Sequence, residues 1–352
     1  MAAILPIDDF LRQGAHIPIV DVRSPAEFAQ GHIPGALNLP LFSDEERACV
    51  GTLYVQKGRN QAVQKGLEIV GPKLRYFTDF ALGLHSPTVA LHCWRGGMRS
   101  ASMAWLFETV GLQCTLLQKG YKAFRQTVLD SFAQPRSLQI LGGLTGSGKT
   151  EILHTLALAG EQVLDLEGIA CHKGSAFGSL GQAAQPGTEH FENLLFMQFS
   201  QFDARKPIWM EDESRNVGRC ALPGAFWEQM RQAPFVWIDT PREVREQRLS
   251  HEYAHFEASQ LCVAIQKIEK RLGFDRCKAA LEACEQGRTR EALRVCLDYY
   301  DKAYTKQVQD RHAITELECL PCPRFTPSFP LDPAQIKQLK QLRHEPIRTD
   351  SE

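Results

Sequence analysis

The amino-acid sequence predicts an α/β protein with two consecutive domains, the second of which ends in a run of helices. Three observations support this prediction. Short apolar runs typical of buried strands alternate with segments typical of helices. A cysteine follows one of these strands, in a loop with two glycines over residues 93–97. A glycine-rich phosphate-binding sequence follows another strand, over residues 143–150.

Composition limits what the chain can be. Its 352 residues are enough for two domains with sizeable cores, and 43% apolar and 23% charged residues are ordinary for a globular protein. A net charge of −1 excludes a strongly cationic nucleic-acid binder, so an RNA site must be a local basic patch. The N-terminus lacks signal-peptide features, and no apolar run approaches membrane-spanning length. The 11 scattered cysteines favour a reducing compartment, so we expect a cytoplasmic protein without membrane contact.

We expect the first domain over residues 1–133. Ser24 is placed to cap a helix that has Pro25 in its first turn. A second helix, over residues 101–110, is closed by Gly111. The expected strands cover residues 17–22, the end of the turn at 31–40, residues 88–91 and residues 115–117.

Cys93 follows the strand at residues 88–91, where backbone N–H groups and the start of a helix face the sulfur. Arg95 and Arg99 add positive charge, so this setting should lower the thiol pKa and stabilise negative charge near the sulfur. The alternative is a buried structural cysteine, the usual fate of a lone cysteine. Two arginines and two glycines in the next six residues favour a reactive thiolate, with Cys93, Arg95 and Arg99 as catalytic residues.

The first domain resembles the rhodanese family. The resemblance rests on Asp21-Val22-Arg23, Glu27-Phe28 and Gly31-His32-Ile33-Pro34-Gly35-Ala36, with Gly120-Tyr121 as the closing segment. It implies that Cys93 is the active-site cysteine. We expect the Asp, Arg and His of the first signature to brace the fold rather than take part in chemistry. The segment at residues 45–66 is longer than a minimal rhodanese domain needs.

Arg99 departs from the common rhodanese pattern, because it lies six residues after Cys93 where that family usually has an arginine five residues after. His92-Cys93, five residues and Arg99-Ser100 also match the signature of cysteine phosphatases. A wider loop has more N–H groups and can accept an oxyanion. A phosphatase therefore remains an alternative.

After a linker at residues 131–136, the second domain is expected over residues 137–310. Its first strand, residues 138–141, leads into a full Walker A sequence and a helix over residues 151–158. The loop should cradle a di- or triphosphate, with the lysine at the terminal phosphates and the threonine at Mg²⁺. The phosphate-binding candidates are Gly143, Gly146, Ser147, Gly148, Lys149 and Thr150.

Further strands are expected at residues 162–164, 207–210 and 235–238. Glu211 or Asp212, at the end of one of them, is the candidate metal-organising carboxylate, and a solvated acidic turn is the alternative. A glycine-rich basic loop at residues 172–178 is typical of a substrate loop. Arg242, Arg245 and Arg248 recur at every third position of an expected helix, so they face roughly the same way. They contact either phosphates or solvent. Together the candidates for substrate or Mg²⁺ contacts are Asp165, Lys173, Ser175, Glu211, Asp212, Arg215, Arg242, Arg245 and Arg248.

The rest of the chain carries weaker signals. Residues 260–309 are predicted to be helical, and Tyr300 and Tyr304 within them are more typical of core and surface than of a site. Cys319 and Cys322 form the closest cysteine pair, but without further ligands we expect no zinc site. Residues 311–352 are expected to form a tail that is first proline-rich and then basic, with a solvated tail favoured over an RNA contact.

The ordered set of motifs resembles the bacterial tRNA 2-selenouridine synthase family. Besides the two loops, the set comprises Asp165-Leu166-Glu167-Gly168, His172-Lys173-Gly174-Ser175-Ala176-Phe177-Gly178 and Glu211-Asp212-Glu213-Ser214-Arg215. Lys173 stands where the family has an arginine, which keeps the charge and loses the bidentate fork.

The resemblance implies an enzyme that replaces sulfur by selenium in the wobble 2-thiouridine of tRNA. Selenophosphate, made by a supplier enzyme, would donate the selenium, and geranyl diphosphate would S-geranylate the thiouridine to make a better leaving group. No tightly bound cofactor is implied, and Mg²⁺ would accompany the diphosphate. Two alternatives stay open: an ATP-dependent tRNA sulfurtransferase, and a regulatory protein with a phosphatase-like cysteine loop.

Overall fold

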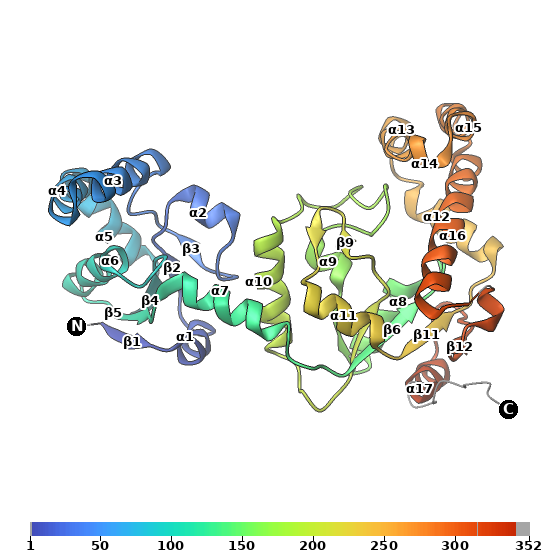
Figure 1. Cartoon of the computed structure of the whole chain (residues 1–352), viewed down its shortest axis with the longest axis horizontal. Coiled ribbons are helices and arrows are strands. Elements are labelled where there is room, and N and C mark those ends of the chain that lie inside the picture. The colour runs from blue at the N-terminus through green and yellow to red at the C-terminus, as the bar shows by residue number, and fades with distance from the viewer. Residues whose placement is uncertain (1, 315, 343–352) are drawn as a thin grey trace. The chain divides into compact units, whose positions relative to one another are not determined.

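The computed structural model describes residues 2–314 and 316–342 (Figure 1). The chain forms two compact units, each an α/β fold with a five-stranded parallel sheet, which confirms the predicted fold class. The units are not consecutive in sequence. The first comprises residues 1–132 and 187–197, and the second comprises residues 133–186 and 198–352. Residues 187–197, which were expected in the second domain over 137–310, therefore belong to the first unit.

The sheet of the first unit has the strand order β1-β5-β4-β2-β3, with every neighbouring pair parallel. Parallel strands need covering on both faces, and the central strand β4 is buried along nearly its whole length. The strands are β1 Ala3–Leu5, β2 Ile19–Asp21, β3 Leu37–Asn38, β4 Thr88–His92 and β5 Gln113–Leu117. Strand β1 was not expected, because three residues are too short to show a period.

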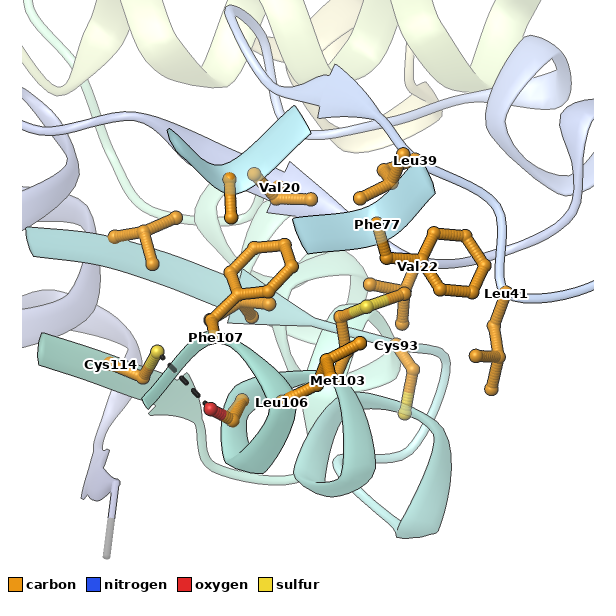
Figure 2. Packing of buried hydrophobic residues seen from close by; sticks show 14 of the residues in the cluster. Val20, Val22, Leu39, Leu41, Phe77, Cys93, Met103, Leu106, Phe107 and Cys114 are labelled. Atoms are coloured by element: carbon orange, nitrogen blue, oxygen red, sulfur yellow. Dashed lines mark hydrogen bonds between the residues drawn. The ribbon is translucent and has the colours of Figure 1, made fainter. Parts of the chain in front are cut away.

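Helices cover both faces of this sheet. On one face α5 and α6 place Phe77, Met103 and Phe107 against the strands, and Figure 2 shows Cys93 in the same apolar cluster, near Met103. On the other face α1 and α7 contribute Phe10 and Tyr121, which flank His92. The helices are α1 Ile7–Gly14, α2 Pro25–Gln30, α3 Asp44–Lys57, α4 Arg59–Val70, α5 Leu74–Gly83, α6 Met98–Thr109 and α7 Gly120–Ser131, with a 3₁₀ turn at Gly71–Lys73.

The unexplained segment at residues 45–66 forms most of the helix pair α3 and α4. Ser43 caps α3 by accepting a hydrogen bond from the Glu46 backbone N–H, and the Glu46 side chain accepts one from the Ser43 N–H in return. Gly58, with φ of 83°, joins the two helices. The extra length therefore builds a helical layer beside the cysteine loop.

In the sequence, helix α10 (Thr188–Phe199) falls between the two segments of the second unit. In the structure, nearly all of this helix belongs to the first unit. Its Asn193 is fully buried, and the side chain donates to the His32 carbonyl at 2.9 Å and to the Tyr121 hydroxyl at 2.7 Å. Its Oδ1 accepts a hydrogen bond from Arg125 at 2.5 Å. Phe196 meets Phe124 of α7 edge-on, so this helix completes the covering of one face of the sheet.

The sheet of the second unit has the order β12-β11-β6-β8-β7, again all parallel. The central strand β6 is buried at every residue and runs directly into the phosphate-binding loop. A separate antiparallel pair joins β9 to β10. The strands are β6 Leu138–Gly142, β7 Gln162–Val163, β8 Ile208–Glu211, β9 Asn216–Val217, β10 Cys220–Ala221, β11 Phe235–Ile238 and β12 Arg324–Phe325.

Several helices of the second unit pack against one another in a separate apolar cluster. Helices α13, α15 and α16 share an apolar cluster that contains Leu261, Ala280 and Leu297. The helices are α8 Lys149–Leu158, α9 Leu166–Ala170, α11 Gly224–Gln232, α12 Arg242–Tyr253, α13 Ala258–Gln266, α14 Glu269–Leu272, α15 Phe274–Glu285, α16 Thr289–His312 and α17 Pro333–Leu342, with a 3₁₀ turn at Leu317–Cys319.

Part of the expected solvated tail is folded. Strand β12 pairs with β11 at the sheet edge, and its Phe325 is buried. Leu339 of α17 is fully buried in the cluster that also contains Ile152 and Trp209. The expectation of a free tail from residue 311 is therefore wrong for these segments, while residues 343–352 lie outside the described residues. No helix among the described residues is long and apolar enough to cross a membrane.

Candidate active sites: a cysteine loop and a phosphate-binding loop

Cys93 lies at the end of β4, with its sulfur between the strand end and the first turn of α6. The residue is 2% exposed, so little water reaches it. The Ser100 hydroxyl is 3.3 Å from the sulfur and 3.2 Å from the Gly97 carbonyl, and its single proton can serve either acceptor. The loop is closed by α7, whose Tyr121 N–H donates to the Cys93 carbonyl at 2.8 Å.

The closing segment requires a glycine. Gly120 has φ of 63°, and a β-carbon at this position would lie 2.3 Å from the Cys93 carbonyl oxygen. Such a contact is far inside van der Waals distance, so any side chain would push the cysteine loop away from α7. Gly120 therefore sets the position of the backbone that carries Cys93.

Hydrogen bonds and charge make Cys93 an acidic thiol. Burial raises its pKa, but the hydrogen bond from Ser100, the positive charge of Arg99 and the backbone N–H groups of Ser100 and Gly97 outweigh burial, so the net pKa is lowered. Cys114, a buried cysteine of the same unit, lacks such donors, and burial raises its pKa to about 12. The comparison of the two cysteines shows that the donors and charge of the loop lower the pKa of the Cys93 thiol, whereas burial alone raises a thiol pKa.

The two predicted arginines differ in their surroundings. Arg99 is partly buried and donates to Glu27 at 3.0 Å, which fixes the guanidinium near the sulfur. Arg95 is exposed at the mouth of the loop. Arg99 therefore stabilises the thiolate, whereas Arg95 is positioned to meet an anion that approaches from solvent.

The first signature braces the fold. Arg23 is fully buried and its Nη2 lies 2.6 Å from Asp21 and 2.7 Å from the Gly31 carbonyl. Its guanidinium stacks on the Tyr121 ring at 3.7 Å. These contacts tie β2, the turn at Gly31 and α7 together, and the guanidinium also lies 6.0 Å from the ring of Trp94 in the cysteine loop.

In the second unit, the phosphate-binding loop joins β6 to α8. Gly148 has φ of 88°, and a β-carbon there would lie 2.3 Å from the Phe329 ring. Lys149 donates to the Gly143 carbonyl at 3.0 Å, so its ammonium group lies over its own loop. The loop adjoins a pocket of about 990 Å³. Its described lining residues are mostly polar, with Leu249 as the one large aliphatic side chain.

Three carboxylates meet in this pocket: Glu167 of α9, Glu211 at the end of β8 and Glu213 just beyond it. One oxygen from each lies within 4.8 Å of the other two. Burial raises all three pKa values, and mutual repulsion raises those of Glu167 to about 10 and Glu213 to about 8. Thr150 donates to Glu211 at 2.6 Å. A concentrated negative charge with a hydroxyl beside it fits a hard divalent cation such as Mg²⁺.

Glu211 and Asp212, left open as alternatives by the sequence, have different surroundings. Asp212 is buried in an ion pair with Arg311 at 2.5 Å and accepts from the Tyr304 hydroxyl at 2.7 Å. The Gly143 N–H in turn donates to Tyr304 at 3.3 Å. Asp212 is thus neutralised and anchors α16 to the loop, so Glu211 is the carboxylate placed to organise a metal.

The glycine-rich loop at residues 172–178 borders the same pocket. Lys173 pairs with Glu252 of α12, and both line the pocket. Gly174 packs so closely that a β-carbon would lie 3.0 Å from a Glu167 oxygen. The Tyr300 hydroxyl accepts a hydrogen bond from the Ala176 N–H at 2.8 Å. Lys173 and Ser175 therefore line the same pocket as the three carboxylates.

The three arginines of α12 divide between pocket and scaffold. Arg248 lines the pocket and donates to Glu151 at 2.6 Å. Arg242 pairs with Asp298, and the buried Arg245 pairs with Asp301, so both hold α12 against α16. Of the two possibilities that the spacing left open, Arg248 faces the pocket, whereas Arg245 forms a buried ion pair and Arg242 an exposed one.

Two other predicted residues lie outside the lining of the pocket. Asp165 caps α9 by accepting from the Gly168 N–H at 2.8 Å. Arg215 is exposed at the start of the β9–β10 pair. Conversely, Glu167, Glu213 and Tyr304 line the pocket without being predicted. The first two belong to quoted motifs, so their acidity was a usable signal, whereas Tyr304 gave none.

Family comparisons cover nearly the whole described chain. A family model described as the tRNA 2-selenouridine synthase AAA domain matches residues 136–317, and one described as the rhodanese-like domain matches residues 7–127. The chain is 34% identical to a tRNA 2-selenouridine synthase of Nitrosomonas europaea, over 84% of this chain and 90% of that protein. It is 38% identical to one of Hydrogenovibrio crunogenus, over 86% and 93%.

Among solved structures, the chain is similar to the N-terminal domain of a putative ATP/GTP binding protein from Clostridium difficile 630. The identity is 36%, over 36% of this chain and 99% of that one, with a TM-score of 0.35.

Proposed function

The chain belongs to the tRNA 2-selenouridine synthase family, and on that premise we propose that it replaces sulfur by selenium in the wobble 2-thiouridine of tRNA, through an S-geranylated intermediate. One observation carries the proposal. A single chain holds both an acidic thiol in an anion-binding loop and a phosphate-binding loop with a carboxylate cluster. An exchange of selenium for sulfur that passes through a prenyl diphosphate needs both kinds of site.

The second unit would carry the first step. The thiouridine sulfur attacks the first carbon of geranyl diphosphate, and a carbon–sulfur bond forms as the carbon–oxygen bond breaks and diphosphate leaves. The base releases its N3 proton in the same step. Lys149 and the N–H groups of its loop would hold the diphosphate. Thr150 and Glu211 would hold Mg²⁺, which when bound neutralises charge on the diphosphate. Lys173 and Arg248 lie on the same pocket and would hold the remaining phosphate oxygens.

The first unit would carry the second step. Selenium from selenophosphate, which a separate enzyme must supply, attacks C2 of the base. The C2–S bond breaks, and geranylthiolate leaves with the electron pair and takes up a proton. Water then cleaves the Se–P bond and releases phosphate. Cys93 would guide the selenophosphate selenium toward C2, and Arg95 and Arg99 would hold its anionic forms. The 11 cysteines, all free thiols, suit the reducing cytoplasm where we place the reaction.

The test is the modified-nucleoside profile, by mass spectrometry, of 2-thiouridine tRNA and S-geranylated tRNA after incubation with selenophosphate and geranyl diphosphate. Lys149→Ala should fail to geranylate or selenate the first substrate, yet selenate the second. Cys93→Ala should geranylate the first and selenate neither. Cys49→Ala, at an exposed cysteine, is the control and should behave as wild type.

Three results would contradict the proposal. If Cys93→Ala loses geranylation as completely as Lys149→Ala, the division of labour is wrong. If the reaction requires ATP instead of geranyl diphosphate as its co-substrate, the protein is an ATP-dependent tRNA sulfurtransferase. If neither variant alters tRNA but the wild type hydrolyses an aryl phosphate through Cys93, the protein is a phosphatase.

A further inference from the structure

A groove of about 1280 Å³ lies in the first unit, between helices α3, α4, α5 and α6 and the cysteine loop. Much of its lining is large, apolar and exposed: Val55 is 84% exposed, Leu67 67% and Trp105 63%. Solvent-exposed apolar side chains gathered on one groove are costly in water and are typical of a binding site. The helix pair α3–α4, which forms much of its wall, is the segment that a minimal domain of this fold does not need.

The charged side chains among the described lining residues of this groove have one sign. Among its described lining residues are the four arginines Arg47, Arg59, Arg95 and Arg99, and no aspartate or glutamate. Arg47 and Arg99 share Glu27, at 3.8 Å and 3.0 Å, as a partner beyond the lining. The groove therefore suits a ligand with a long apolar part and an anionic part.

The groove also reaches the reactive sulfur. Cys93 and Met103 belong to its lining, together with the exposed Met98 at the start of α6. A chain that lies along the groove thus has one end beside the thiolate. By contrast, the phosphate-binding pocket of the second unit has Leu249 as its one large aliphatic side chain among the described lining residues and contains the carboxylate cluster.

We propose that this groove binds the geranyl chain of S-geranylated 2-thiouridine while the sulfur is exchanged at Cys93. The inference rests on the two-step function proposed above and gives its second step a specificity site. The apolar walls hold the ten-carbon chain, and the arginines face the RNA phosphates near the nucleoside. Burying the chain positions the C2–S bond at the cysteine loop and selects geranylated over unmodified nucleosides.

The test places a negative charge in the groove. Leu67→Asp should lower kcat/KM for selenation of S-geranylated tRNA by at least about tenfold, since burial of each methylene contributes about fourfold to affinity. Selenation of S-methylated tRNA, which has no chain to bury, and geranylation of 2-thiouridine tRNA should stay within about twofold of wild type. Leu82→Asp makes the same change at a 56% exposed residue of α5 outside the groove and should alter none of the three.

Different failures have different meanings. Unchanged selenation of S-geranylated tRNA by Leu67→Asp, with a melting temperature near that of wild type, overturns the groove assignment. Loss of geranylation with intact selenation also overturns it, because the groove would then hold geranyl diphosphate. A wild-type protein that never selenates S-geranylated tRNA contradicts the proposed function itself. Val55→Asp, at an 84% exposed site of the same groove, repeats the test if Leu67→Asp does not fold.

Discussion

A buried thiolate is stable only where hydrogen bonds and positive charge replace the water that it loses. Cys93 meets this condition through side chains and N–H groups that all belong to the eight residues from Cys93 to Ser100. The reactive state of the sulfur is therefore encoded locally. Changes within that stretch should alter reactivity without altering the rest of the fold.

Ser100 is the side chain whose removal tests this reasoning most directly. Ser100→Ala removes the hydroxyl 3.3 Å from the sulfur, which should raise the thiol pKa and reduce the thiolate fraction at neutral pH. We expect alkylation of Cys93 by iodoacetamide at pH 7 to slow about fivefold to tenfold, which corresponds to the roughly 1 kcal/mol that one intramolecular hydrogen bond contributes. Peptide mass spectrometry across pH 5–10 measures the rate of modification.

Ser102→Ala is the matched control, because it removes a hydroxyl from the same helix that donates to the Arg99 carbonyl rather than to sulfur. Its alkylation profile should match wild type. An unchanged profile for Ser100→Ala would show that Arg99 and the backbone suffice, and would leave Ser100 without a part in activating the thiol.

Local encoding also explains which site residues could be predicted. Cys93, Arg99 and Lys149 lie in short stretches where strand, loop and helix follow one another, so sequence spacing fixed their geometry. Tyr304 reaches the phosphate-binding loop from 161 residues away, through the folding of α16 against α12. No local spacing predicts such a contact. For Arg242 and Arg245 the spacing correctly indicated a shared helix but could not show that α16 supplies Asp298 and Asp301 as partners.

At the scale of elements, α10 shows how a helix can belong to a unit that its neighbours in sequence do not share. Its pattern of apolar residues predicts a buried face, but the pattern does not name the surface that buries it. Asn193 identifies that surface, because its side chain hydrogen-bonds to the Arg125 guanidinium, the His32 carbonyl and the Tyr121 hydroxyl of the first unit. Strand β12 was missed for a related reason: two residues in a proline-rich stretch carry no period.

Asn193→Ala should destabilise the first unit. The change leaves the His32 carbonyl and the Tyr121 hydroxyl without their donor, and buried groups that lose a partner cost about 1–3 kcal/mol each. We expect the free energy of unfolding to fall by about 2–4 kcal/mol. Urea unfolding followed by tryptophan fluorescence measures the change.

The control is Gln198→Ala, at an exposed position near the end of the same helix, with an expected change within about 0.5 kcal/mol. Equal stability of Asn193→Ala and wild type would mean that α10 is not held to the first unit in solution. Sequence alone could not have motivated the experiment, because an asparagine within a helix is usually a surface residue.

At the scale of the whole molecule, the carboxylate cluster ties stability to pH. The pKa of Glu213 is about 8 in the folded protein against an ordinary 4.5, so between these values the folded state holds a proton that the unfolded chain has released. Stability therefore falls as the pH rises from about 4.5 to 8, and Glu167, with a pKa of about 10, extends the loss to higher pH. This sign is opposite to that of an ordinary salt-bridged carboxylate.

Mg²⁺ should reverse the trend, since it replaces the protons and binds better as they leave. We expect the metal-free protein to have a lower melting temperature at pH 8 than at pH 6, and Mg²⁺ to raise it more at pH 8. Glu213→Gln should raise the metal-free melting temperature at pH 8 and reduce the gain from Mg²⁺. Differential scanning fluorimetry with EDTA or Mg²⁺ measures all of these shifts.

Glu228→Gln removes a carboxylate from the exposed side of α11 and should leave both effects as in wild type. A melting temperature that is independent of Mg²⁺ at pH 8 would show that the three glutamates do not form a cation site. A metal-free protein that is more stable at pH 8 than at pH 6 would contradict the raised pKa values.

Helix α10 also has a consequence for how a gene of this kind can be rearranged. The chain passes between its two units three times, after residues 132, 186 and 197. A break in the coding sequence at the first passage would give two incomplete products. The first unit would lack α10, which covers one face of its sheet, and the second unit would carry α10 without the surface against which it packs. A single crossover at the linker therefore separates α10 from the unit that it covers, so exchange of one whole unit needs further crossovers on both sides of α10.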